Sequence, residues 1–264
     1  MYFKLPNRIV GCGFTALVLS TFFTLSLAAQ DSIRPPDVTR KLTAYRQQIQ
    51  DDPEKEMVEL KSIIPSILYD LRYATRNNFV KRPLYPVGTR QAFLRKKAAL
   101  ALQNVQKELA EKGYGLKIWD AYRPYAVTVK FWELIKDDRY VANPARGSGH
   151  NRGTAVDLTL IYLKNKKEVD MGTGFDHFSD TAHHAFQGLP EEILQDRLLL
   201  RTTMEKYGFK ALETEWWHYS LPDATRYELL DIPFTQLAPG KVKSKNSKSN
   251  PSTRSGTKGK KGNR

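Results

Sequence analysis

The sequence predicts an α+β domain in which a small central antiparallel sheet is flanked by helices. Three segments carry apolar residues at helical spacing, and four shorter segments are typical of extended chain. The helical and extended segments follow one another without a regular β-α-β rhythm, which favours α+β over a parallel α/β fold. The domain is expected to cover residues 53–239 of the 264-residue chain, because the composition changes beyond both limits.

The predicted helices are recognised by apolar side chains that recur about every 3.6 residues. Residues 92–112 show the clearest pattern, and Gly113 is expected to end that helix. A second helix is expected to begin at Pro124 and to reach about residue 136, and a third to cover residues 190–207.

The predicted extended segments are short and rich in β-branched or aromatic residues. They cover residues 63–74, 114–122, 154–163 and 215–220. Within the third, strand alternation places Asp157 on one face and Val156 and Leu158 on the other, core-facing side. A carboxylate there needs a partner or a metal ion, because burying an unpaired charge is costly.

Residues 1–29 have the composition of a secretory signal peptide. Lys4 and Arg8 precede an uncharged, mostly apolar run from Ile9 to Leu27, and small residues follow near Ala28. An uncleaved membrane anchor is the alternative, since about 20 apolar residues suffice to span a bilayer. The sequence therefore predicts export, to the periplasm or the cell surface.

The other end of the chain, residues 240–264, is expected to be a disordered basic tail, and residues 30–52 a polar linker and N-terminal segment. The tail holds nine of the basic residues, and the net charge of +14 falls to +3 over residues 30–239 when both ends are left out. The charge is thus no argument for nucleic-acid binding. The tail is expected either to contact anionic polymers of the cell envelope nonspecifically or to be inert.

Two short motifs carry candidate metal ligands. "SGHNRGTAVD" contains His150 and Asp157, and "EWWH" ends in His218. Cys12 is the only cysteine and lies in the predicted signal, so a metal site must use His, Asp and Glu. Two imidazoles and one carboxylate suit an open tetrahedral Zn²⁺ site. Judged from these residues alone, the alternative to a metal site is an ordinary loop whose polar side chains are hydrogen-bonded.

Two further side chains have types suited to peptide-bond chemistry. Glu215, three residues before His218, could take a proton from water beside a metal ion. On a regular strand the two would point to opposite faces, so the chain must bend or Glu215 must lie at the strand's entrance. Arg123, at a predicted strand-to-helix junction, could stabilise an oxyanion.

"WDAYRP", "SGHNRGTAVDLTL" and "EWWHY", in this order along the chain, resemble the zinc D-alanyl-D-alanine dipeptidases of the type found in vancomycin resistance clusters, in peptidase family M15. "RYATRNNF" and "MGTGFDHF" fit as well, and the resemblance runs from about Leu68 to Ser220. It is more specific than the pattern shared with D,D-carboxypeptidases and hedgehog-like proteins. It implies the same hedgehog- and D,D-peptidase-like α+β fold, with a central antiparallel sheet.

The resemblance also implies a site. One zinc ion per chain would be held by His150, Asp157 and His218. Glu215 would act as general base and then as proton donor to the leaving amine, and Arg123 would stabilise the tetrahedral intermediate.

Three further residues match positions that line the dipeptide pocket in such enzymes: Ser148, Tyr73 and Asp176, the last as partner of the substrate ammonium. Gly149 replaces a serine often seen there, which puts one pocket hydrogen bond in doubt. The implied activity is hydrolysis of D-alanyl-D-alanine to two D-alanines, in the metabolism of cell-wall precursors or fragments. The alternatives are a D,D-carboxypeptidase or peptidoglycan peptidase, and a zinc-stabilised binding module without catalysis.

Overall fold

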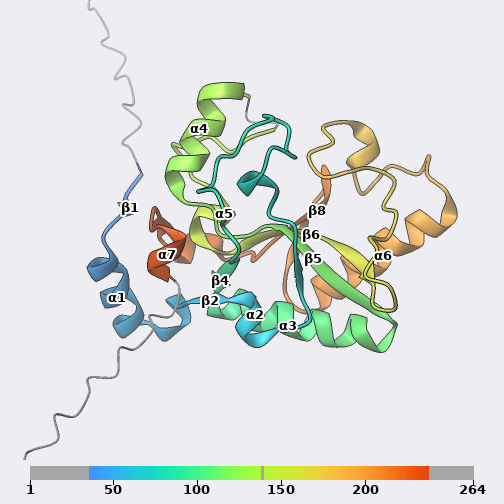
Figure 1. Ribbon diagram of the computed structural model, residues 1–264, viewed down its shortest axis with the longest axis horizontal. Coiled ribbons are helices and arrows are strands. Elements are labelled where there is room, and N and C mark those ends of the chain that lie inside the picture. Colours follow the sequence, from blue (N-terminus) through green and yellow to red (C-terminus); the bar gives the residue numbers. More distant parts are fainter. Residues whose placement is uncertain (1–35, 138–139, 238–264) are drawn as a thin grey trace, which may run out of the picture. The chain divides into compact units, whose positions relative to one another are not determined.

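The computed structural model describes residues 36–137 and 140–237 (Figure 1). The predicted signal peptide and basic tail lie outside these residues. Across the described ranges, no helix combines the length and the apolar character needed to span a bilayer. At the centre is a five-stranded sheet whose strands, in spatial order, are β3 (Leu68–Tyr69), β5 (Tyr114–Asp120), β6 (Ala155–Tyr162), β8 (Glu215–Ser220) and β7 (Lys210–Leu212).

Helices and two smaller strand pairs surround this sheet. The helices are α1 (Leu42–Asp51), α2 (Leu60–Ile63), α3 (Lys96–Glu111), α4 (Tyr125–Ile135), α5 (Gly149–Arg152), α6 (Glu191–Lys206) and α7 (Phe234–Leu237). Single 3-10 turns cover Pro53–Lys55, Arg72–Ala74, Asp180–Ala182 and Ala224–Arg226. In the smaller pairs, β1 (Val38–Thr39) is parallel to β9 (Leu229–Leu230), and β2 (Met57–Glu59) is antiparallel to β4 (Phe93–Arg95). The segment from Val38 to Asp51 thus contributes a strand and a helix to the fold.

The predicted α+β class is confirmed, with one difference in the sheet. The pairs β5–β6, β6–β8 and β7–β8 are antiparallel, as expected, whereas β3 is parallel to β5. Parallel strands need a long crossover, and here β4 and α3 lie between β3 and β5 in the chain.

Two predicted elements were wrong in their boundaries. The helix expected from residue 92 begins at Lys96, because Phe93, Leu94 and Arg95 form β4 and are fully buried. Neighbouring apolar residues at the start of a segment fit a helix and a strand equally well, so periodicity could not separate them. The extended segment expected over residues 63–74 is broken into the end of α2, the two-residue β3 and a 3-10 turn.

One face of the central sheet packs into the core, and the other face carries the buried Asp157. Val156, Leu158 and Leu160 of β6 are fully buried in the core that also contains apolar residues of α3 and α6. Burying each such side chain stabilises the fold by about 1.5–3 kcal/mol. Asp157 points to the opposite face, as strand alternation predicts, and is 3% exposed. The core beneath β6 therefore fixes a carboxylate on the other face.

A fully buried arginine joins the strand pair β2–β4 to the region that carries α5. The Arg95 side chain donates to the carbonyl oxygens of Arg152 (2.8 Å) and Glu228 (3.1 Å), and also to that of Lys55. These three carbonyl groups belong to segments far apart in the sequence.

Replacement of Arg95 by methionine should lower the free energy of unfolding by about 3–5 kcal/mol, because it leaves buried carbonyl groups without donors. Urea unfolding of the metal-loaded protein measures this. The control is Arg90→Met, at an exposed position, and should change stability by less than about 0.5 kcal/mol. Equal stability of the two variants would contradict the role given to Arg95.

Candidate active site

A row of polar residues crosses three neighbouring strands on the face opposite the core. Asp120 of β5 is paired in register with Asp157 of β6, and Asp157 with His218 of β8. Side chains of directly opposed residues on one face lie about 4.5–5.5 Å apart at Cβ. Strand register alone therefore brings an imidazole and two carboxylates together, although they are up to 98 positions apart in the sequence.

His150 reaches this row from the short helix α5. Ser148 caps the helix: its hydroxyl accepts from the Asn151 amide, and its own amide donates to the Asn151 side chain. Gly153, at φ +69°, ends the turn and leads directly into β6. The His150 Nδ1 lies 2.7 Å from the Ala121 carbonyl oxygen. Because a carbonyl only accepts, Nδ1 carries the proton and Nε2 is left to bind a metal.

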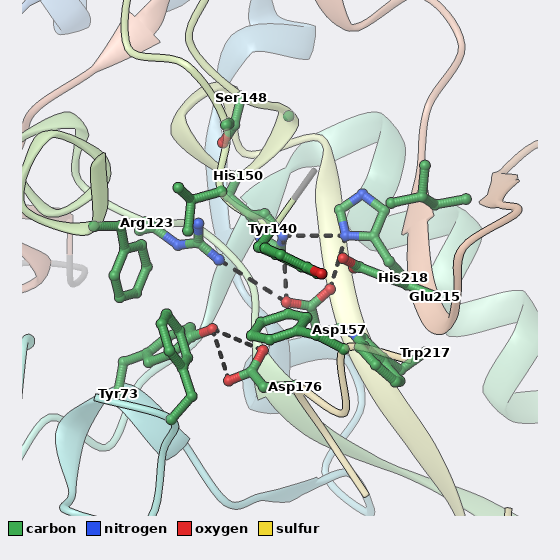
Figure 2. A pocket seen from close by; sticks show the side chains of 17 residues that line it. Tyr73, Arg123, Tyr140, Ser148, His150, Asp157, Asp176, Glu215, Trp217 and His218 are labelled. Atoms are coloured by element: carbon green, nitrogen blue, oxygen red, sulfur yellow. Dashed lines mark hydrogen bonds and ion pairs between the residues drawn. The ribbon is translucent and has the colours of Figure 1, made fainter. Parts of the chain in front are cut away.

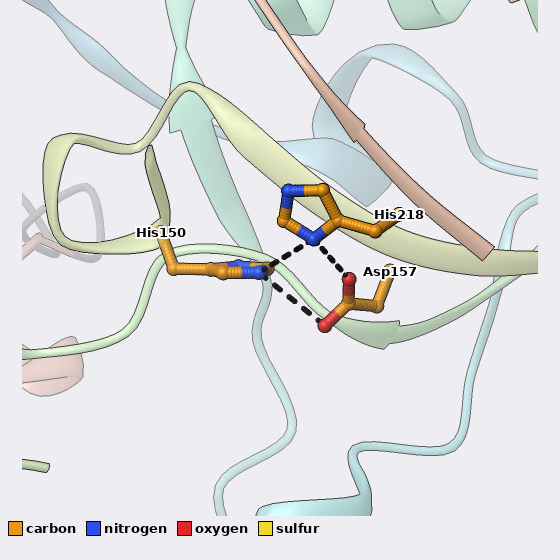
Figure 3. A group of neighbouring side chains, drawn as sticks. All are labelled: His150, Asp157 and His218. Atoms are coloured by element: carbon orange, nitrogen blue, oxygen red, sulfur yellow. Dashed lines mark hydrogen bonds and ion pairs between the residues drawn. The ribbon is translucent and has the colours of Figure 1, made fainter. Parts of the chain in front are cut away.

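The three candidate ligands converge (Figure 3). The His150 Nε2 lies 3.3 Å from the His218 Nδ1 and 3.3 Å from the Asp157 Oδ2, and the His218 Nδ1 lies 2.8 Å from the Asp157 Oδ1. Ligand atoms about 2.0–2.2 Å from a tetrahedral Zn²⁺ stand about 3.3–3.6 Å apart. The donor set thus fits a zinc ion with only small adjustments.

The electrostatics of the cluster favour an ionised Asp157 beside the two imidazoles. Burial alone would raise the pKa of Asp157, but the imidazoles of His150 and His218 outweigh burial and hold this pKa well below its ordinary value. Burial alone would lower the pKa of His218, but the hydrogen bond to Asp157 raises it. The Asp157 carboxylate is therefore ionised and attracts positive charge to this point, which a divalent cation can supply.

Glu215 lies at the entrance of β8, as its first residue, and is half-buried. The pairing of β7 with β8 shifts register just there, from Ala211 opposite Tyr219 to Leu212 opposite Glu215. This irregularity resolves the conflict of faces, since Glu215 lines the same cavity as His218. Burial, reinforced by the charge of Asp157, raises the pKa of Glu215 to about 7. Such a carboxyl group can accept and return a proton near neutral pH.

Arg123 lies just beyond β5, at the start of the turn into α4, and is 7% exposed. Its Nη2 lies 2.8 Å from the Asp120 Oδ2. It also lies 4.0 Å from the Asp157 carboxylate, and Figure 2 marks this ion pair with a dashed line. The guanidinium stands over the rings of Tyr73 (5.2 Å) and Phe131 (4.8 Å). Its backbone amide donates to the His150 carbonyl, which links the arginine to the metal cluster.

The cavity between these groups is small, with a volume of about 240 Å³. Pockets for drug-sized ligands usually measure about 300–1,000 Å³. Asp176 lines the cavity, and its two carboxylate oxygens each lie 3.1 Å from the Tyr73 hydroxyl. Asp176 adopts a left-handed backbone, φ +57°, which aspartate tolerates better than most residues. Burial, together with the charges of Asp157 and Glu215, raises the pKa of Asp176 well above its ordinary value. The same negative charges would attract a cation placed beside Asp176, and such a cation would favour the ionised form of its carboxyl group.

All eight residues singled out from the sequence line this one cavity (Figure 2): Tyr73, Arg123, Ser148, His150, Asp157, Asp176, Glu215 and His218. Gly149 also lines it, and the structure explains the glycine. A Cβ there would lie 2.8 Å from the Cβ of Ala155, which is too close for a serine at this position.

The residues that support Arg123 and α5 from outside the cavity were not predicted from the sequence. Asp120 binds Arg123 and accepts from Tyr85. The side-chain amide of Asn151 donates to the Arg123 carbonyl (2.9 Å) and to the Thr128 hydroxyl (2.8 Å). For Asp120 a signal existed, because a charged residue at the end of an apolar strand, three positions before Arg123, calls for a buried partner. No local pattern marks Tyr85.

An α+β domain with a His-Asp-His cluster, a proton-accepting glutamate and an arginine around a small cavity has the arrangement of a metal-dependent hydrolase. Residues 53–238 match the model of the peptidase M15 family described as D-Ala-D-Ala dipeptidase, and this chain belongs to that family.

Characterised relatives agree with this assignment. The D-alanyl-D-alanine dipeptidase of Escherichia coli K12 is 36% identical over 186 residues, covering 70% of this chain and 95% of the relative. That of Enterococcus faecalis V583 is 34% identical over 188 residues, covering 64% and 93%. That of Streptomyces coelicolor is 31% identical over 179 residues, covering 61% and 89%. The relatives are thus matched over nearly their full length.

Proposed function

We propose that this protein is a zinc-dependent dipeptidase that hydrolyses D-alanyl-D-alanine to two D-alanines. The proposal is carried by one observation: a cluster of three candidate metal ligands and the carboxyl group of Asp176 line the same cavity of about 240 Å³. The names and coverage of the relatives support the substrate.

The side chains divide the chemistry among them. His150, Asp157 and His218 would hold one zinc ion per chain, which when bound polarises the scissile carbonyl and acidifies a water molecule. Glu215 takes the proton of the attacking water and then delivers it to the leaving amine. Arg123 donates hydrogen bonds to the carbonyl oxygen as negative charge develops on it.

Selectivity for a dipeptide would follow from Asp176 and Tyr73, which line the cavity beside the cluster. Asp176 and the Tyr73 hydroxyl would bind the free ammonium group of the substrate. A longer or N-acylated peptide has no charge at this point and would leave a buried carboxyl group without its partner. Sites that rely on such a partner reject analogues that lack it.

Asp176→Asn should therefore raise the KM for D-alanyl-D-alanine by about 10–100-fold, because it removes a charge-assisted hydrogen bond worth about 1.5–3 kcal/mol. It should also lower the ratio of kcat/KM for the free dipeptide to kcat/KM for its N-acetyl derivative. The matched control is Asp180→Asn, whose side chain is 94% exposed, and which should leave both values nearly unchanged. An unaltered KM in Asp176→Asn would remove this residue from the ammonium site.

The zinc-loaded protein should be assayed against D,D-, L,D- and L,L-dialanine and against a pentapeptide stem. Release of two D-alanines from the D,D-dipeptide, with little cleavage of the stem, is the expected outcome. Efficient release of D-alanine from the stem would instead indicate a D,D-carboxypeptidase or peptidoglycan peptidase. Retained zinc without any turnover would indicate a binding module.

We further propose that the enzyme is exported and acts in the periplasm or at the cell surface. The signal-like composition of residues 1–29 and the absence of cysteine from residues 30–264 support this location. The basic residues of 240–264 would give it weak attraction to anionic envelope polymers. N-terminal sequencing of the protein from fractionated cells distinguishes a cleaved signal from a retained anchor.

A further inference from the structure

Asp120 is buried at the end of β5, with 0% of its surface exposed, behind the cavity. Its Oδ2 accepts from the Arg123 Nε at 3.0 Å and lies 2.8 Å from the Arg123 Nη2. Its Oδ1 accepts from the Tyr85 hydroxyl. Both carboxylate oxygens thus have partners, and one of these partners is the Arg123 guanidinium, which lines the cavity.

A carboxylate at this place is costly for the fold. Asp120 stands opposite Asp157 across β5 and β6, and like charges in that arrangement destabilise a sheet. Burial of the charge adds a further cost. A residue retained only for packing would be better served by an uncharged side chain of similar volume. This cost is explained if the Asp120 carboxylate controls the position of Arg123.

Asp120 is the polar group in closest contact with the guanidinium. Among the residues that the structure describes, the guanidinium nitrogen atoms hydrogen-bond to Asp120, its Nη2 lies farther from the Asp157 carboxylate, at 4.0 Å, and its planar faces contact the rings of Tyr73 and Phe131. Ring contacts permit rotation in the plane, whereas two donors on one carboxylate oxygen fix the angle of the group. Asp120 therefore determines which nitrogen atom of Arg123 points into the cavity.

We propose that Asp120, itself oriented by Tyr85, is a positioning residue that holds Arg123 toward the oxygen on which negative charge develops. This role rests on the proposed dipeptidase function. A competing role through His150 is disfavoured by distance, because the His150 Nδ1 lies 3.7 Å from Asp120 but 2.7 Å from the Ala121 carbonyl oxygen.

Asp120→Asn should lower kcat by about 10–100-fold and change KM less than about threefold. The reason is that a misaligned Arg123 loses a hydrogen bond that forms chiefly in the transition state. Tyr85→Phe should act in the same direction, with a loss of about 3–10-fold. Both variants should contain as much zinc per folded chain as the wild type.

The decisive test is a double-mutant cycle with Arg123→Ala. If Asp120 acts through the guanidinium, Asp120→Asn should cost less than about twofold in the Arg123→Ala background. Independent, multiplying losses would overturn the proposal, as would lower zinc affinity with normal kcat per bound zinc. If Asp120→Asn does not fold, the same cycle is run with Tyr85→Phe, and multiplying losses there overturn the proposal equally.

Assays of the wild type distinguish failure of the positioning role of Asp120 from failure of the proposed dipeptidase function. A zinc-loaded wild type that does not cleave D-alanyl-D-alanine overturns the dipeptidase and the positioning role with it. An active wild type with an unaffected Asp120→Asn overturns the positioning role alone.

Discussion

Glu215→Gln is expected to lower kcat by about 10²–10⁴-fold while zinc binding is retained. Glutamine keeps the shape of the side chain but cannot accept a proton from water or return one to the leaving amine. The Glu215 side chain is suited to both steps, because its surroundings raise its pKa to about 7. Steady-state kinetics and zinc content per chain, measured on one preparation, test the prediction.

The matched control is Glu213→Gln, two residues earlier. Glu213 has a side chain that is 64% exposed and pairs with Arg201 at 2.7 Å on the surface. Its replacement should leave kcat within about twofold, since exposed ion pairs contribute little. Near-normal turnover of Glu215→Gln would rule out the general-base role.

His218→Ala is expected to abolish zinc retention and activity together. The variant removes one of two imidazoles from a three-ligand cluster, and the remaining pair, His150 and Asp157, cannot complete a stable zinc site. Zinc affinity is measured by competition with a chromogenic chelator, and activity at saturating zinc. His177→Ala, at an exposed position near Asp176, should retain both properties. Tight zinc binding by His218→Ala would show that the metal lies elsewhere.

The sequence predicted the residues of the site better than their arrangement. Strand alternation in β6 correctly separated Asp157 from the aliphatic residues that face α3. What brings His218 beside Asp157 is the register of β6 with β8, a pairing across 61 positions that no local pattern records. The resemblance to a known family supplied that proximity where spacing alone left it open.

Two features could not be settled from the sequence, for different physical reasons. The place of Glu215 depends on an irregular pairing of β7 with β8, which is a property of the hairpin and not of either strand. The role of Asp120 depends on burial, since the same Asp-X-X-Arg spacing on a surface would form a weak, solvated ion pair. Both features are decided only once the strands are assembled.

The most direct test of the account is a zinc titration of metal-free protein with D-alanyl-D-alanine as substrate. Activity should be absent before zinc is added, rise in proportion to the zinc bound, and reach its plateau at one ion per chain. Two D-alanines should appear for each dipeptide consumed. Full activity in the presence of a strong chelator would contradict the account, and so would a plateau that requires two ions per chain.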